Sequence, residues 1–172
     1  LSMTINGAAR STPVFLSCYV ENDLRLDKYF AETDEKGCRK NKKAGSNNYL
    51  CTFRVGEIYL TAAEAAARLG ELSQARTRLL ELMRKRYAPE AYEAKSVVVN
   101  AMDKEALVQE ILDERARELA FEGHRWFDLR RSTRPRLEKV VDGTRYVLEE
   151  NDARYTLAIP KEAIEANPGL LN

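Results

Sequence analysis

Apolar residues recur at intervals of three and four between Arg54 and Leu69, and this spacing predicts an amphipathic helix. At 100° per residue, one face carries six apolar residues, and we expect it to be buried: Val55, Ile58, Ala62, Ala65, Ala66 and Leu69. The opposite face carries Glu57, Thr61, Glu64 and Arg68, of which the last two are spaced for an ion pair. Gly70 then provides the stop of the helix.

A second helix is predicted from Leu72 to Arg86, because apolar residues again repeat at three and four: Leu72, Ala75, Leu79, Leu82 and Met83. The two helices, joined by a tight glycine turn, form a helical hairpin. Ala63, Gly70 and Ala75 have the small-residue spacing of a tetratricopeptide unit, although no second copy follows 34 residues later. A single unit cannot bury both of its faces, so we expect it to pack on other material.

The remainder of the chain is less regular. We expect a short strand within residues 14–20, one or two helical turns within residues 23–30, and an exposed loop over residues 32–48. A loop with Pro89 and the β-rich stretch 95–100 precedes Asp103, which can cap a third helix. The resulting plan is a mainly α fold with a loop-rich segment 1–50, a helical core 51–132, and a loop, short strand and C-terminal turn in 133–172.

Composition excludes several classes of function. The 172 residues carry 28 basic and 27 acidic side chains, so the net charge of +1 does not indicate a nucleic-acid partner. No apolar run approaches the ~20 residues that span a bilayer. A single histidine and three cysteines offer no zinc site, and Cys38 and Cys51 either pair or stay free. No targeting signal is found, so we expect a cytosolic protein or part of a longer one.

The most unusual stretch is "ERARELAFEGHRWFDLRR", which begins at Glu114. On a helical wheel, Arg115 lies inside the apolar arc formed by Val108, Ile111, Leu112, Leu119 and Trp126, and Glu118 and Glu122 lie on its edge. A charge buried alone costs several kcal/mol, so these groups must be paired. Local pairs are available within the helix, namely Arg115–Glu118, Asp113–Arg117 and Glu122–Arg125. The glutamates at 110, 114, 118 and 122 lie four residues apart, and their mutual repulsion offsets the gain from these pairs. We therefore interpret the charged groups as charge locks, which are polar contacts that join this helix to other elements.

A catalytic interpretation of the same stretch remains as an alternative. Glu118 and Glu122 lie one turn apart, which suits an acid/base pair for glycoside cleavage. However, the neighbouring arginines would keep both carboxylates ionised, whereas a general acid needs a raised pKa. The structural interpretation is therefore favoured. His124 has no acidic partner placed for it by the sequence and is not predicted to act as a base.

Three blocks resemble one known family in the expected order. These are "RVGEIYLTAAEAAARLGELSQA", "ILDERARELAFEGHRWFDLRR" and the final "AIPKEAIEANPGLLN", and "NDLRLDKYF" near the start also fits. Together they resemble the C-terminal region of the SusD/RagB family. The resemblance implies a mainly helical, SusD-like fold with tetratricopeptide-like units, in a chain that is the C-terminal portion of a longer protein. It also implies scaffold roles, as charge locks, for Glu114, Glu118, Glu122, Arg125, Asp128 and Arg130, to which the wheel adds Arg115.

The resemblance further implies a function. Family members are outer-membrane lipoproteins at the cell surface, anchored through an N-terminal region that this chain lacks. They bind oligosaccharides or other nutrients without catalysis or cofactors, as partners of a SusC-like, TonB-dependent transporter. Sugar binding needs exposed aromatic residues beside amides or hydroxyls, and the candidates are Asn47, Asn48 and Tyr49, and Tyr87 with Tyr92. The alternatives are an interaction scaffold without a ligand of its own, and the hydrolase described above.

Overall fold

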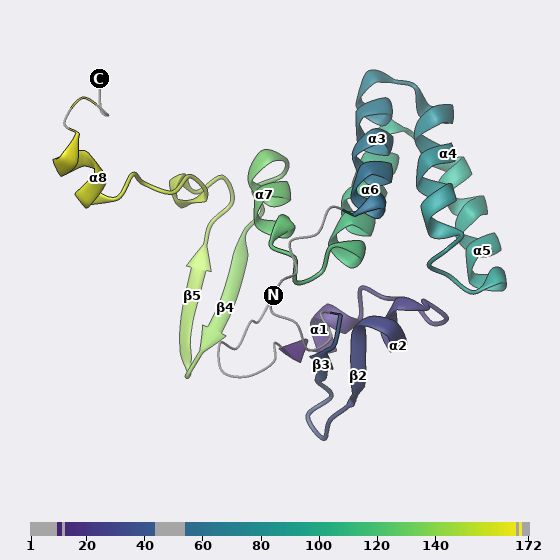
Figure 1. Cartoon of the computed structure of the whole chain (residues 1–172), viewed down its shortest axis with the longest axis horizontal. Coiled ribbons are helices and arrows are strands. Elements are labelled where there is room, and N and C mark those ends of the chain that lie inside the picture. Colours follow the sequence, from purple (N-terminus) through teal and green to yellow (C-terminus); the bar gives the residue numbers. More distant parts are fainter. Residues whose placement is uncertain (1–9, 12, 44–53, 168, 170–172) are drawn as a thin grey trace. The chain divides into compact units, whose positions relative to one another are not determined.

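The computed structural model describes residues 10–11, 13–43, 54–167 and 169, and helices dominate it (Figure 1). The helices are α1 (Pro13–Leu16), α2 (Arg25–Tyr29), α3 (Val55–Leu69), α4 (Leu72–Met83), α5 (Pro89–Ala101), α6 (Lys104–Glu118), α7 (His124–Arg131) and α8 (Lys161–Ala166), with a 3-10 turn η1 (Ala153–Tyr155). The strands are β1 (Arg10–Ser11), β2 (Phe30–Thr33), β3 (Arg39–Asn41), β4 (Leu137–Val141) and β5 (Thr144–Leu148). The prediction of a mainly α fold is confirmed.

The helical hairpin predicted from the sequence is formed by α3 and α4 (Figure 1). Gly70 adopts the left-handed conformation, with φ 86°, and its N–H donates to the carbonyls of Ala66 and Ala67. A residue with a Cβ rarely takes this conformation, which explains the glycine at the turn. Helix α6 packs against α3, and α5 packs against α4. Small alanines and larger apolar residues fill the core between them: Leu60, Ala63, Ala66, Ala67, Ala75, Leu79, Leu82, Met83, Tyr87, Val99, Leu107 and Ile111.

The prediction of which face of α3 is buried is wrong. Of its six residues only Ala66 is buried, and the other five are exposed: Val55, Ile58, Ala62, Ala65 and Leu69. The core instead receives Gly56, Leu60, Ala63 and Ala67, together with Glu64, which was expected on the solvent side and forms the predicted ion pair with Arg68 at 2.9 Å. The prediction failed because α3 is apolar on two sides, and periodicity alone does not show which side meets α4 and α6.

Three segments differ from their predicted secondary structure. Residues 89–101 form a helix rather than a loop, because proline is tolerated in the first helical turn, where its missing N–H costs no hydrogen bond. The apolar run 14–20 begins in the short helix α1 rather than in a strand. The predicted exposed loop over residues 32–48 contains part of β2 and all of β3, which form a three-stranded antiparallel sheet in the order β1-β3-β2. The predicted turns within residues 23–30 are confirmed as α2.

The third helix starts as expected and ends earlier than the wheel assumed. The side chain of Asp103 caps α6 by accepting a hydrogen bond from the N–H of Ala106, at 2.9 Å. The helix ends at Glu118, and the turn to α7 contains Phe121 and Gly123, both with positive φ. The ring of Phe121 lies edge-on to those of Phe15 and Phe30, 5.6 and 6.0 Å away, which anchors the turn.

The described residues form two compact units, one up to Arg125 and one from Trp126 onward. In the second unit Trp126 stacks on Tyr155, with ring centroids 5.1 Å apart, so Trp126 does not belong to the face of α6 as predicted. Strands β4 and β5 pair as a hairpin around Asp142 and Gly143, where one short strand was expected. An Asp-Gly turn is a strong hairpin signal that the sequence interpretation missed.

Two further observations concern the described part of the chain as a whole. None of its helices is long and apolar enough to cross a bilayer. Cys18 and Cys38 carry free thiols, and Cys51 lies outside the described residues.

Candidate functional site

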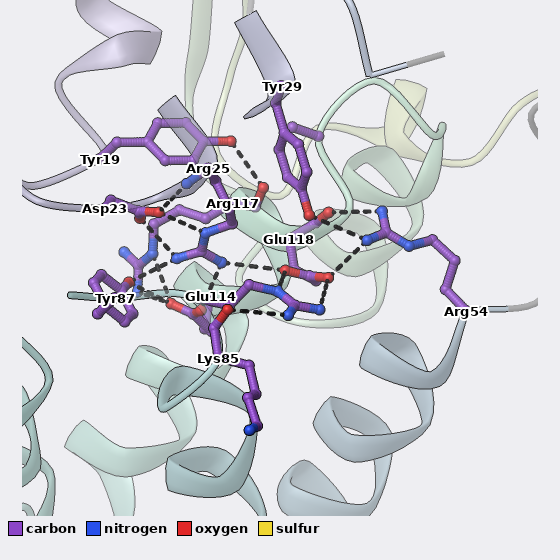
Figure 2. Close-up of polar contacts among 12 residues, drawn as sticks. Tyr19, Asp23, Arg25, Tyr29, Arg54, Lys85, Tyr87, Glu114, Arg117 and Glu118 are labelled. Carbon is purple, nitrogen blue, oxygen red and sulfur yellow. Dashed lines mark hydrogen bonds and ion pairs between the residues drawn. The ribbon is translucent and has the colours of Figure 1, made fainter. Parts of the chain in front are cut away.

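A buried cluster of charged side chains lies where the C-terminal half of α6 meets α2 and the segment after α4 (Figure 2). Its centre is Arg25, whose side chain is only 2% exposed. The guanidinium binds both oxygens of Asp23, at 2.9 and 2.8 Å, and Glu114 at 2.7 Å. An arginine with five donors in a fixed plane suits this role, because it can bind two carboxylates at once.

Backbone geometry holds Arg25 and Asp23 in place. The N–H of Leu24 donates to the carbonyl of Arg86 at 2.9 Å, and the N–H of Ala88 donates to the carbonyl of Asn22 at 3.0 Å. Asn22 has a positive φ of 64°, a conformation that asparagine tolerates better than most residues. The carboxylate of Asp23 also accepts the backbone N–H of Arg25, at 3.0 Å. Backbone hydrogen bonds alone therefore join the segment before α2 to the segment after α4.

Glu114 is fully buried and fully satisfied. It accepts hydrogen bonds from Arg25, from Arg117 at 2.8 Å and from the hydroxyl of Tyr87 at 2.9 Å. Burial alone would raise the pKa of Glu114, but the charges of Arg25 and Arg117 outweigh it and lower the pKa to about 2. Glu114 is therefore ionised at neutral pH, and no lone pair facing the solvent is left for a ligand.

Glu118 lies one turn further along α6 and is bound from three directions. Arg54 reaches one oxygen at 2.8 Å, Arg86 reaches both oxygens at 2.8 and 2.9 Å, and Arg25 lies 3.4 Å away. Burial raises the pKa of this carboxyl, and the three arginines together lower it by more. A general acid must hold a proton near neutral pH, so Glu118 is unsuited to donate one.

The outer edge of the cluster is formed by Glu122, Lys43 and Arg54. Glu122 makes close ion pairs with both cations, and Lys43 also donates to the carbonyl of Ala120 at 3.2 Å. The ammonium of Lys43 lies 4.5 Å from the centre of the Tyr29 ring, a favourable cation–π distance. Burial lowers the pKa of Lys43 to about 8, and Glu122 only partly compensates.

Every carboxylate in this cluster is paired with at least one cation. Five carboxylates face six cations: Asp23, Glu110, Glu114, Glu118 and Glu122 against Arg25, Lys43, Arg54, Arg86, Lys95 and Arg117. Because all five carboxylates are already paired, the set offers no free acid and base. The same side chains join segments that lie up to 93 residues apart in the sequence. The geometry thus supports a structural role for the cluster, which we call the ionic core.

The partners of the charged residues along α6 differ from the predicted local pairs at Arg117 and Arg125. Arg117 binds Glu110 and Glu114 rather than Asp113, which lies 3.9 Å from Arg125. Arg115 is buried and donates to the hydroxyl of Thr61 on α3, at 3.2 Å.

The other predicted charge locks have partners of their own or none among the described ion pairs. Arg125 donates to the carbonyl of Leu112 at 3.3 Å, and the buried Asp128 binds Arg131 at 2.7 Å. Arg130 forms no side-chain ion pair with any residue that the structure describes. Its assignment as a lock therefore remains a prediction.

The candidate ligand residues have different outcomes. The expectation that Tyr87 is an exposed sugar platform is wrong, because it is 2% exposed and its hydroxyl bridges Arg25 and Glu114. Tyr92 is half-buried and packs against the apolar core. Asn47, Asn48 and Tyr49 lie outside the described residues. The binding surface itself thus stays a prediction.

Sequence reasoning missed the partners that α6 uses. Asp23 and Arg25 were placed in an irregular segment, and Arg54 and Arg86 were taken as ends of helices. One signal was available for Arg25, which stands between Leu24 and Leu26 in a block of the family pattern. An arginine amid apolar residues in such a block suggests a buried partner, as the wheel already indicated for Arg115.

Fold and ionic core together define a mainly helical protein in which buried charges join segments that are distant in the sequence. The model of the SusD family matches residues 19–172, and the chain belongs to that family. A SusD-like protein, P38 from Formosa agariphila, is 31% identical over 115 residues, or 66% of this chain. A SusD-like carbohydrate binding protein from Bacteroides vulgatus has a similar fold, with a TM-score of 0.59 over 93% of this chain at 18% identity.

The matched relatives are longer than this chain. The match spans 22% of the Formosa protein and 40% of the Bacteroides chain. At 18% identity the second likeness concerns the fold alone.

Proposed function

We propose that this region is part of a cell-surface binding protein that captures oligosaccharides or related nutrients without cleaving them. The observation that carries the proposal is the family match over residues 19–172. A solved relative with a similar fold is described as carbohydrate binding, which supports a glycan as the ligand class. In this proposal the protein lies on the outer membrane through a lipid anchor outside these residues. It passes its ligand to a SusC-like, TonB-dependent transporter.

The state of the buried carboxylates supports binding without catalysis. Glycoside cleavage by two carboxylates requires one of them to be protonated at working pH. In the ionic core the pKa of Glu114 is held at about 2 and that of Glu118 is also lowered, both by arginines. Glu122 is occupied by Lys43 and Arg54. Of the two positions that the sequence suggested for a hydrolase, Glu118 is thus unsuited to act as a general acid, and Glu122 is already bound by two cations.

We propose that ligand contacts come from the surface around the ionic core rather than from the core itself. Asn47, Asn48 and Tyr49 combine amides with an aromatic ring, the groups that hydrogen-bond and stack on a sugar. They follow Lys43 and precede Arg54, which are both fixed to Glu122. The ends of the segment that carries them are therefore held by the ionic core. Tyr92 stays a weaker candidate, since it is half-buried.

The test is calorimetric titration of the natural polypeptide with a panel of neutral and acidic oligosaccharides, with reducing ends assayed in the same samples. We expect saturable heat with at least one glycan and no new reducing ends. Tyr49→Ala should weaken binding at least tenfold. Tyr146→Ala is the matched control, because that tyrosine is 58% exposed on the β4–β5 hairpin and should leave binding unchanged.

Two results would contradict the proposal. Failure of every glycan to bind would favour the scaffold alternative. Release of reducing ends that stops in a folded Glu118→Gln variant would favour the hydrolase. Co-purification with a barrel transporter from outer membranes tests the proposed partner separately.

A further inference from the structure

Helix α5 carries four apolar side chains on the side that faces away from the core. The helix packs on α4 (Figure 1), and its Val99, which is 1% exposed, is part of the apolar core. On the outer side lie Val97 and Val98, which are 70% and 56% exposed, together with the exposed Ala94 and Ala101. Spacings of three, one and three residues place all four on one side of a helix. We call this set the α5 stripe.

Two properties of the α5 stripe indicate a contact surface. Consecutive β-branched valines lower the intrinsic stability of a helix, so Val97 and Val98 are not explained by helix propensity. They also gain little from burial within the described part of the chain, because both stay mostly exposed. Contiguous exposed apolar side chains, unlike scattered ones, normally mark a surface that binds a partner. The alanines at both ends leave room for a second helix to approach closely.

We propose that the α5 stripe binds the α5 stripe of a second copy of this protein, with the two helices antiparallel and related by a two-fold axis. If Ala94 of one copy lies opposite Val98 of the other, the axis repeats the same contact in reverse. Ala101, three residues beyond Val98, then lies opposite Ala91, three residues before Ala94. Each Val98 thus fills the space above an alanine, and small residues meet at the ends. This arrangement allows the helix axes to approach to about 8–10 Å.

A parallel pair of the same helices would pack less well. A two-fold axis parallel to the helices places every residue opposite its own copy, so Val98 meets Val98 and Ala94 meets Ala94. The valine pair then holds the helices apart, and the alanine pair loses its contacts. The order of small and large residues in the α5 stripe therefore favours the antiparallel pair.

The charged residues beside the α5 stripe are compatible with the antiparallel pair. On one side, the exposed Glu93 comes beside the exposed Asn100 of the other copy, whose amide can donate a hydrogen bond to the carboxylate. On the other side, the two copies of Lys95 approach each other, but each ammonium is already paired with Glu110 at 3.6 Å. A contact between two single helices is smaller than the ~1,200 Å² of stable complexes, so we expect weak and reversible association.

Disulfide trapping of the natural polypeptide tests both the contact and its register. In a background with the native cysteines changed to serine, Ala94→Cys and Val98→Cys are oxidised in a glutathione buffer, alone and as an equal mixture. A disulfide requires Cβ atoms about 3.5–4.5 Å apart, which the proposed pair offers only between position 94 and position 98. Each position lies about 6 Å along the helix axis from its own copy. We expect the mixture to form linked dimers at least tenfold faster than either variant alone.

A mixture of Ala94→Cys with Ser73→Cys measures linking by random collision, because Ser73 is exposed on α4 and lies outside the α5 stripe. Equal rates for the two mixtures would overturn the proposal. Faster linking of Ala94→Cys or Val98→Cys with itself would also overturn it, since that requires another register.

Sedimentation equilibrium provides a second readout without cysteines. We expect the average mass of the unmodified polypeptide to rise with concentration, and Val98→Lys to abolish the rise. Val140→Lys is the matched control, because Val140 is 60% exposed on β4 and should leave the rise unchanged. A constant mass for the unmodified polypeptide, or a rise that persists in Val98→Lys, would contradict the proposal. Neither measurement uses a ligand, so both are independent of glycan binding.

Discussion

Helix α6 has two halves that are buried in different ways. Its first half places Leu107 and Ile111 in the apolar core, where both are 0% exposed. Its second half places Glu114 and Glu118 in the ionic core, and both are also 0% exposed. Burial is thus equally complete along the helix, but one half is held by dispersion and the hydrophobic effect and the other by paired charges.

The two cores differ in what they specify. Apolar contacts are non-directional, and those of the first half come from α3, α4 and α5. Charge pairs have fixed donors and acceptors, and those of the second half reach Arg25, Arg54 and Arg86. Replacing a buried ion pair with apolar residues can be neutral, but removing one partner leaves a charge uncompensated. The ionic core therefore fixes the position of irregular segments that have little apolar surface of their own.

The largest expected effect is the loss of the central cation. Arg25→Ala leaves Asp23 and Glu114 buried without their shared partner, and we expect the free energy of unfolding to fall by about 3–5 kcal/mol at pH 7. Chemical denaturation monitored by circular dichroism measures the change. A loss below about 1 kcal/mol would show that the cluster is solvated rather than buried.

A matched change in the apolar core comes next. Leu79 on α4 is 0% exposed, so Leu79→Ala should cost about 2–5 kcal/mol through lost burial and the cavity left behind. This cost should be the same at pH 7 and pH 3, since no charge is involved. The cost of Arg25→Ala should shrink at pH 3, where the unpaired carboxylates take up protons. Parallel behaviour of the two variants with pH would remove the distinction between the cores.

Low pH should reduce the stability contributed by the ionic core and leave that of the apolar core unchanged. The pKa of Glu114 is about 2 in the folded protein against an ordinary value of 4.5, so its contribution is complete above pH 4.5. As pH falls through this window toward 2 the unfolded state binds the proton first, and up to about 3 kcal/mol of stability is lost. In Glu114→Gln we expect the free energy of unfolding to fall less steeply as the pH is lowered, measured by denaturation between pH 5 and 2. An unchanged slope would assign the acid sensitivity to other groups.

The smallest expected effect concerns a surface pair. Arg78 and Glu81 on α4 are 3.3 Å apart and each is nearly half exposed. Arg78→Ala should change the free energy of unfolding by no more than about 0.5 kcal/mol, because solvent screens the pair. Denaturation in low and high salt provides the check. A loss comparable to that of Arg25→Ala would mean that burial does not distinguish the charges of this protein.

Local signals predicted the parts of the fold that depend on neighbouring residues. The hairpin follows from the repeats in α3 and α4 and from Gly70, and the start of α6 follows from Asp103. The orientation of α3 could not be predicted, because its two apolar sides are equivalent until the partners are known. Helix α5 was missed because "SVVVN" favours strands locally, while Val99 packs into the apolar core.

Only half of the ionic core could be predicted from the sequence. Glu118 and Glu122 were recognised because their positions on the wheel require partners, and Glu114 was recognised through the resemblance to the family. The partners themselves come from segments as far away as Asp23 and Arg25, and no local rule connects residues so far apart in the sequence. Tyr87 was misassigned for the same reason, since its hydroxyl is used by two distant side chains of that core.

The most direct test of the account is an NMR titration of the carboxyl carbons of Glu114 and Glu118 in the folded protein, with and without an oligosaccharide. The account predicts a pKa of about 2 for Glu114 and a lowered pKa for Glu118, with neither resonance moved by the sugar. A pKa at or above the ordinary value for either group, or a resonance that shifts when the sugar binds, would show that these carboxylates serve a ligand or a reaction instead.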